Sequence, residues 1–233
     1  MGFLGPDVWF DGALRVLVVD DVELDRRRLV VALESDPNVE VVGEAATLEQ
    51  ARAKAAAIPP SVTVMTLTLG DVPAVETVEA VLEVAPHTRV LALVTPDDQR
   101  SALAAIRVGA VGTVVRDGSR DVALAAVRAL AAGESVLDDQ TAADVLAEVD
   151  RLAAGELVPG EEAAPIVDDL ARQVLAGRAA GTDVASLSAR LDLDEHRVGT
   201  HLDDALAALQ RQVAEREAAT RAALVSGLRG LRR

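Results

Sequence analysis

Between residues 14 and 133, short aliphatic segments alternate with segments whose apolar residues recur at helical spacing. The aliphatic segments are rich in valine and leucine, the composition of strands buried on both faces of a parallel sheet. They occupy residues 15–19, 39–42, 62–67, 90–94 and 111–115. Each is followed by a helix-like segment, so the pattern predicts five βα units with right-handed crossovers. The expected fold class is α/β, with a five-stranded doubly wound parallel sheet.

The pattern changes after about residue 136, where only helix-like segments follow. Three apolar stripes separated by short breaks indicate a small all-α helix-turn-helix domain. We therefore divide the chain into five parts. These are an N-terminal extension (1–13), an α/β domain (14–136), a helical linker (137–160), a helix-turn-helix domain (161–211) and a C-terminal helix (212–233).

Two adjacent carboxylates, Asp20 and Asp21, directly follow the first predicted strand. Ligands of open α/β sheets bind outside the carboxyl ends of the strands, so this pair is expected at the functional edge. Adjacent carboxylates repel each other, and a divalent cation held by oxygen ligands is one remedy. The alternative is that the two residues only begin the next helix, since aspartate is favoured at helix N-termini.

Composition narrows the function classes. Half of the residues are hydrophobic, so we expect a packed core. The absence of cysteine excludes disulfides, thiol catalysis and thiolate metal sites. A formal net charge of −15 argues against broad attraction to nucleic acid or anionic lipid. No apolar run has membrane-spanning length and no signal peptide is recognisable, so a soluble, cytoplasmic protein without membrane contact is expected.

Catalysis is not expected, because the sequence contains no nucleophile–base pair and no complete set of metal ligands. The only aromatic residues, Phe3, Trp9 and Phe10, lie in the N-terminal extension. They are either an anchor for a partner or an extra strand that covers the core, and the sequence does not separate these alternatives.

Three segments together resemble the receiver domain of response regulators of the NarL/FixJ type. They are residues 15–21, the Gly-Ala-Val-Gly turn at 109–112 and the Ala-Ala-Gly-Glu segment at 131–134, and the likeness covers about residues 14–136. The resemblance implies a phosphoacceptor aspartate at the end of the third strand and a serine or threonine at the end of the fourth. It also implies a lysine at the end of the fifth strand and magnesium bound with the help of the acidic pair.

The chain departs from that pattern at three positions. Thr66 occupies the phosphoacceptor position and Arg116 the lysine position. Val94 stands where the hydroxyl residue belongs, although the neighbouring Thr95 takes that place if the alignment slips by one residue. A threonine hydroxyl without an activating base is not the nucleophile that forms an acyl phosphate at neutral pH. We therefore expect a vestigial receiver site that is not phosphorylated.

The same substitutions weaken cation binding, because one carboxylate ligand and its negative charge are lost. Asp20 and Asp21 then form a weak Mg²⁺ site at most, and no other cofactor is expected. Arg116 keeps a positive charge, but its planar fork does not reproduce the point charge of lysine. It is expected to pair with Asp20 or Asp21 and to leave a salt-bridged sheet edge.

Residues 187–202 resemble the LuxR-type DNA-binding core, with a likeness that covers about residues 168–209. Val198, Thr200 and His201 match the Val-Lys-Thr-His signature of that family. The resemblance implies that the helix carrying them lies in the major groove of DNA. Arg197, Thr200 and His201 are then candidate contacts, and capping or packing is an equally good interpretation of His201.

Two positions of this helix oppose DNA binding. Gly199 replaces the groove-facing lysine, and Asp203 stands at the next basic position. Neutralisation of phosphates supplies much of the affinity for DNA, so an acid on a reading helix reduces it.

Two functions remain open. In the first, the protein is an atypical response regulator that binds DNA as a dimer and is controlled independently of aspartyl phosphorylation. In the alternative, it binds no DNA and modulates an intact regulator by pairing with it as a heterodimer. The fifth helix of the α/β domain offers a docking surface for such a partner, although most of its apolar residues serve the core. Those residues are Val122, Ala125, Val127 and Leu130.

Overall fold

The structure is a computed structural model that describes residues 13–95, 99–116, 120–154 and 166–230. The aromatic residues of the N-terminal extension lie outside the described residues, and so does the Gly-Pro-rich stretch inside residues 155–165.

A five-stranded parallel sheet forms the centre of the N-terminal half, with the strand order β2-β1-β3-β4-β5. Its strands are β1 (Leu14–Val19), β2 (Val39–Ala45), β3 (Val62–Thr66), β4 (Arg89–Val94) and β5 (Ala110–Val115). The central strands are almost wholly buried, and every residue of β3 is buried. The predicted α/β fold class is confirmed, because continuous valine-rich runs are stable only where both faces of a strand are covered.

Helices cover both faces of this sheet. One face carries α1 (Glu23–Leu33) and α5 (Arg120–Ala131), and the other carries α2 (Leu48–Ala57), α3 (Ala74–Val84) and α4 (Gln99–Arg107). Alternate strand residues divide between the two hydrophobic clusters: Val16 and Val18 face α1 and α5, whereas Leu17 and Val19 face the other layer. This alternation places side chains from one strand into both cores.

The first turns of α2 and α1 have different surroundings. Thr47 caps α2 by accepting a hydrogen bond from the Gln50 N–H, and the Gln50 side chain accepts one from the Ala46 N–H. These contacts form a capping arrangement around the first turn. Leu24 of α1, in contrast, is a large apolar residue that is exposed. It lies in the first turn, ahead of the residues that reach the sheet.

Four helices follow the sheet. They are α6 (Asp139–Ala154), α7 (Asp169–Ala179), α8 (Val184–Leu191) and α9 (Glu195–Gly230). Asp168 and Asp183 cap α7 and α8 through side-chain hydrogen bonds to backbone N–H groups. The predicted helix at 212–233 is not a separate element. It continues α9, which passes residue 211 without a break.

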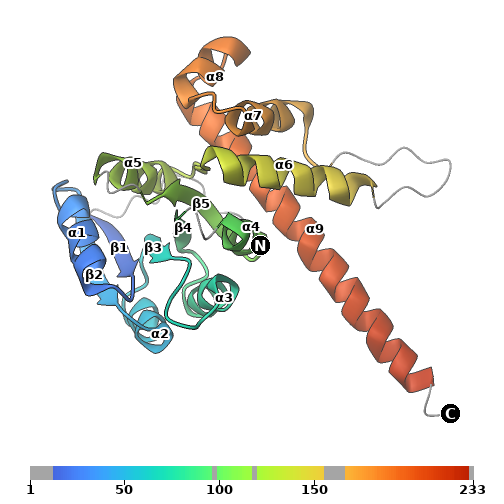
Figure 1. The fold of residues 1–233 in the computed structure, drawn as a ribbon, viewed down its shortest axis with the longest axis horizontal. Helices are drawn as coiled ribbons and strands as arrows, with labels where there is room; N and C mark the ends of the chain where they lie inside the picture. Colours follow the sequence, from blue (N-terminus) through green and yellow to red (C-terminus); the bar gives the residue numbers. More distant parts are fainter. Residues whose placement is uncertain (1–12, 96–98, 117–119, 155–165, 231–233) are drawn as a thin grey trace.

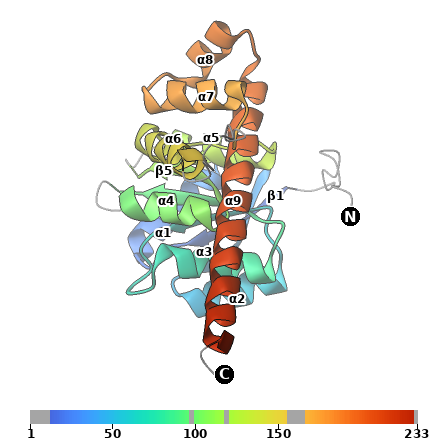
Figure 2. The same ribbon diagram turned by 90° about the vertical axis from the view of Figure 1, so that its right-hand side faces the viewer.

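The C-terminal helices share a core with α3 and α4 of the sheet domain. One cluster of buried side chains extends from Ile106 at the end of α4, through Val145 and Val149 of α6, to Leu202 and Leu206 of α9. Helix α9 begins beside α7 and α8, crosses α6 and α4, and ends in a segment that projects from the rest of the molecule (Figures 1 and 2). Within the predicted helical linker, α6 is a helix whose buried apolar side chains belong to this shared core. None of the described helices combines the length and hydrophobicity needed to cross a bilayer.

Candidate functional site

The parallel register brings the predicted sheet-edge residues together. Val19 lies opposite Met65, so the residues that follow them, Asp20 and Thr66, end neighbouring strands. On the other side, Val94 lies opposite Val115, and the Arg116 N–H donates to the Val94 carbonyl. The four positions therefore form one row along the carboxyl edge of the sheet.

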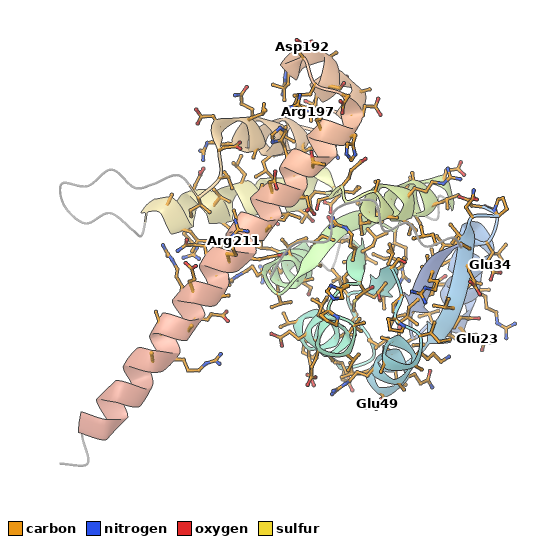
Figure 3. All side chains as sticks on the ribbon, turned by 180° about the vertical axis from the view of Figure 1, so that it is seen from behind. Glu23, Glu34, Glu49, Asp192, Arg197 and Arg211 are labelled. Atoms are coloured by element: carbon orange, nitrogen blue, oxygen red, sulfur yellow. The ribbon has the colours of Figure 1, made fainter. Side chains whose placement is uncertain are left out.

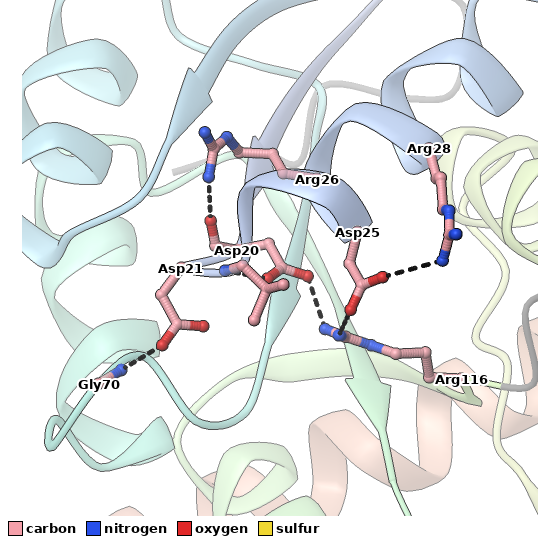
Figure 4. Close-up of polar contacts among 8 residues, drawn as sticks. Asp20, Asp21, Asp25, Arg26, Arg28, Gly70 and Arg116 are labelled. Atoms are coloured by element: carbon pink, nitrogen blue, oxygen red, sulfur yellow. Dashed lines mark hydrogen bonds and ion pairs between the residues drawn. The ribbon is translucent and has the colours of Figure 1, made fainter.

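Asp20 is buried at this edge, and both of its carboxylate oxygens are engaged. Oδ1 accepts a hydrogen bond of 2.8 Å from the Val22 N–H, and Oδ2 accepts one of 2.6 Å from Nη2 of Arg116 (Figure 4). Burial raises the pKa of Asp20 above its usual value, while the Val22 N–H and the Arg116 charge act in the opposite direction. A buried carboxylate is tolerated here because a charged partner and a backbone donor compensate for lost hydration.

Arg116 is bound on more than one side. Its Nη1 lies 3.2 Å from Oδ2 of Asp25, a residue of the first turn of α1 (Figure 4). Of the two partners that the sequence left open, Arg116 takes Asp20. Asp21 instead accepts a hydrogen bond of 3.0 Å from the Gly70 N–H. The guanidinium thus ties the end of β5 to the end of β1 and to α1.

The remaining sheet-edge candidates carry no charge. Thr66 is almost fully buried at the end of β3, and Val94 is fully buried at the end of β4. Thr95, the neighbouring hydroxyl residue, is half-buried and makes polar contacts. No second carboxylate of a neighbouring strand faces Asp20 from the Thr66 position, since a hydroxyl stands there.

These residues do not fit a magnesium ion. Both oxygens of Asp20 already accept hydrogen bonds, and one of them contacts the guanidinium of Arg116. Mg²⁺ needs near-octahedral oxygen coordination, usually with carboxylate ligands, and a guanidinium at the same carboxylate repels it. Across the described residues, no group of three or more acidic or histidine side chains is placed to hold a metal.

A second set of candidates lies on the first turns of α9, and two of them contact the sheet domain. Asp203 forms an ion pair of 2.5 Å with Nη2 of Arg89 and accepts a hydrogen bond of 2.8 Å from Oγ of Ser135. The carbonyl of Gly199 accepts a hydrogen bond of 3.1 Å from the Ser135 N–H. The same nitrogen of Arg89 also donates to the carbonyl of Glu134.

Gly199 permits this contact by having no side chain. A Cβ at this position would lie 2.7 Å from Cβ and 2.8 Å from Cγ of Glu134, closer than such atoms approach. His196, one turn earlier, adds a contact of 2.7 Å between its Nδ1 and Oε1 of Glu134. We call residues 134–135 together with Arg89 the α9 dock. The two substitutions that oppose DNA binding are the two that contact the α9 dock.

The other candidates on α9 have different surroundings. Arg197 is exposed at the end of the molecule formed by α7, α8 and the start of α9 (Figure 3), and its N–H donates to Oδ1 of Asp194. Thr200 donates its hydroxyl to the Arg197 carbonyl. His201 is half-buried, and its Nδ1 is buried without a hydrogen-bond partner.

Sequence reasoning missed the partners of Gly199 and Asp203. Arg89 begins a strand and Ser135 follows a helix, and neither position belongs to a periodic pattern. The only usable signal was a glycine inside a strongly helical segment, which costs about 1 kcal/mol relative to alanine and so points to a packing reason.

Comparison with known proteins agrees with the fold of the sheet domain. The family model described as the response regulator receiver domain matches residues 16–128. Residues 16–128 are a receiver domain. The match ends within α5, so the family model leaves α6 to α9 without an assignment.

Relatives extend the comparison. The chain is 37% identical over 136 residues to the DNA-binding transcriptional activator DevR/DosR of Mycobacterium tuberculosis, covering 58% of this chain but only 63% of the relative. It is 27% identical over 189 residues to an uncharacterized transcriptional regulatory protein, YxjL, of Bacillus subtilis, covering 81% and 86%. The RcsB response regulator of Salmonella typhimurium has a similar fold, with a TM-score of 0.51 at 17% identity over 85% of this chain and 92% of that one.

Proposed function

We propose that this protein is a response-regulator-like transcriptional regulator that binds DNA through α8 and α9 and is controlled independently of aspartyl phosphorylation. The observation that carries the proposal is the Arg116–Asp20 ion pair beside Thr66. An acyl phosphate requires a carboxylate nucleophile, and this edge has a hydroxyl in its place. The cationic partner that would stabilise a phosphoryl group is already bound to a buried carboxylate.

Two observations support DNA binding: the order of helices α8 and α9, and the name of a relative. Helices α8 and α9 have the order and the capped turn of a helix-turn-helix, with Asp194 at the start of the second helix. A relative of the receiver part is named as a DNA-binding transcriptional activator. By analogy with two-fold helix-turn-helix proteins, the regulator acts as a dimer on two half-sites about one helical turn apart.

The contact between α9 and the α9 dock could control DNA binding in place of a phosphoryl group. In the packed arrangement, Gly199 and Asp203 face Glu134, Ser135 and Arg89, so that face of α9 does not reach a DNA groove. We propose that DNA binding requires this contact to open. The receiver domain then acts through contact with α9 and not through a phosphoryl group.

Phosphorylation is tested directly by incubating the full chain with acetyl phosphate and Mg²⁺ and measuring its intact mass. We expect no acid-stable or acid-labile phosphoryl adduct, whereas a regulator with an intact receiver, treated in parallel, gains one. A Thr66→Asp, Arg116→Lys variant provides the matched gain-of-function comparison. An adduct on the unmodified chain would disprove phosphorylation-independent control.

A second function is favoured by one observation. Gly199 and Asp203, which reduce DNA affinity, both serve the internal contact. This fits a protein that binds no DNA and pairs with an intact regulator. One measurement distinguishes the two functions, because only the first predicts saturable binding of the full chain to its own upstream DNA.

A further inference from the structure

Arginines gather around one pocket of about 430 Å³ between α4, α6 and α9. The pocket has a mostly apolar wall rimmed by charged side chains, and it lies apart from the sheet edge and from the α9 dock. Its lining residues are Arg107, Arg151, Leu152, Val213, Arg216, Glu217, Thr220 and Arg221. Four arginines and one glutamate give this surface a positive charge in a chain whose net charge is −15.

Two of these arginines are oriented by Glu148, which lies buried beneath them. Arg151 contacts both of its carboxylate oxygens, at 2.7 and 2.8 Å, and Nε of Arg107 lies 3.7 Å from Oε1. The hydrogen bond from Arg151 lowers the pKa of Glu148 despite its burial, so this carboxylate stays ionised. Glu148 therefore holds the two side chains in place while each stays more than a third exposed to solvent.

The α9 side of the pocket is also ordered. Nη2 of Arg216 donates a hydrogen bond of 2.6 Å to the Leu152 carbonyl near the end of α6. Arg221 lies further along α9 and is exposed. Leu152 and Val213 are almost fully buried and form the floor. Four arginines therefore line this pocket, with Glu148 and Glu217 as the acidic residues beside them.

We propose that this pocket binds a small phosphate-bearing anion. Planar guanidinium groups match phosphate oxygens in paired hydrogen bonds, and here arginines from three different helices line one hollow. A volume of about 430 Å³ is within the range of small-ligand pockets. The lining residues come from the receiver domain, α6 and α9, so the ligand contacts all three.

The test is calorimetric titration of the full chain with inorganic pyrophosphate at moderate ionic strength. We expect saturable binding that Arg221→Gln weakens by about tenfold or more, because the variant loses a charge-assisted hydrogen bond to the anion. Arg211→Gln is the matched control, because it removes the same charge from an exposed position of the same helix outside the pocket. This control is expected to bind as the unmodified chain does.

A nucleoside diphosphate titrated in parallel identifies the source of the phosphate. Tighter binding than pyrophosphate assigns the ligand to nucleotides, and equal binding assigns it to the phosphate group alone; both outcomes support the site. Lack of saturable binding, equal losses in the two arginine variants, or sulfate binding as tightly as pyrophosphate would overturn it. Displacement of pyrophosphate by duplex DNA would instead show a contact to the DNA backbone, and the small-ligand site would then be wrong.

Discussion

A single ion pair decides the chemistry of the sheet edge. Arg116 contacts a carboxylate of which only 1% is exposed, and that carboxylate has one further donor, the Val22 N–H. Breaking a buried pair leaves an uncompensated charge, which costs far more than the loss of a surface pair. We therefore expect the Arg116–Asp20 pair to stabilise the fold, so that removing Arg116 lowers the free energy of unfolding.

Replacement of Arg116 tests this role. We expect Arg116→Met to lower the free energy of unfolding by about 2–3 kcal/mol, less than the roughly 3–5 kcal/mol of fully buried pairs because Arg116 keeps some exposure. Urea denaturation at neutral pH measures the change. Arg116→Met combined with Asp20→Asn should recover part of the loss, since no buried charge then remains. A stability equal to that of the unmodified chain would show that the pair contributes nothing.

Gly199 gives a second prediction at the residue scale. Glycine to alanine inside a helix normally stabilises by about 1 kcal/mol. Here the new Cβ would meet Glu134 at 2.7 Å, so we expect Gly199→Ala to give no stabilisation and to loosen the α9 dock. Thermal unfolding of this variant is compared with Gly230→Ala, near the end of the same helix. A gain in stability at Gly199 would mean that Glu134 moves away without cost.

The strands could be predicted from the sequence, whereas several contacts between distant elements could not. Valine-rich runs fixed the five strands, because a strand buried on both faces admits few polar residues. The carboxyl ends of neighbouring parallel strands meet at one edge, so the row from Asp20 to Arg116 was also predictable. The α9 dock was not, since it joins Arg89, Ser135 and Asp203 over sequence separations that no local pattern records.

The dock itself leads to a prediction at the element scale. Asp203→Asn removes the ion pair with Arg89 but keeps the helix, so the first turns of α9 should separate from the receiver domain more often. We expect faster amide hydrogen exchange in residues 196–206 and at Ser135, by roughly three- to tenfold for a loss of about 1 kcal/mol. Asp204→Asn, one position further along, is the control. Unchanged exchange in Asp203→Asn would mean that the pair does not hold α9.

At the scale of the whole molecule, acidic residues make stability depend on pH. The Asn38 N–H and then Arg128 hold the pKa of Asp36 below its usual value, and Arg151 does the same for Glu148. A carboxyl group whose pKa is lower in the folded state than in the unfolded state stabilises the fold at pH values above its unfolded pKa. This stabilisation is lost as the pH falls through the pKa of the folded state. Burial raises the pKa of Asp20, and its effect has the opposite sign.

We therefore expect the melting temperature to fall as the pH drops below about 4, the range of unperturbed carboxyl groups. Asp36→Asn and Glu148→Gln should each lower stability at neutral pH and approach the unmodified chain in acid. Calorimetric unfolding over a pH series measures this convergence. A difference that persists in acid would assign the effect to packing instead of charge.

The central claim is that this chain binds DNA without phosphoryl control, and one measurement tests it most directly. Fluorescence anisotropy of the full chain with its own upstream DNA, over a salt series and with or without acetyl phosphate and Mg²⁺, reports both parts. We predict saturable binding that an unrelated duplex does not displace, tightened by Asp203→Asn and unchanged by acetyl phosphate. No binding even at low salt, where phosphate contacts are strongest, would contradict the claim and favour the interaction protein.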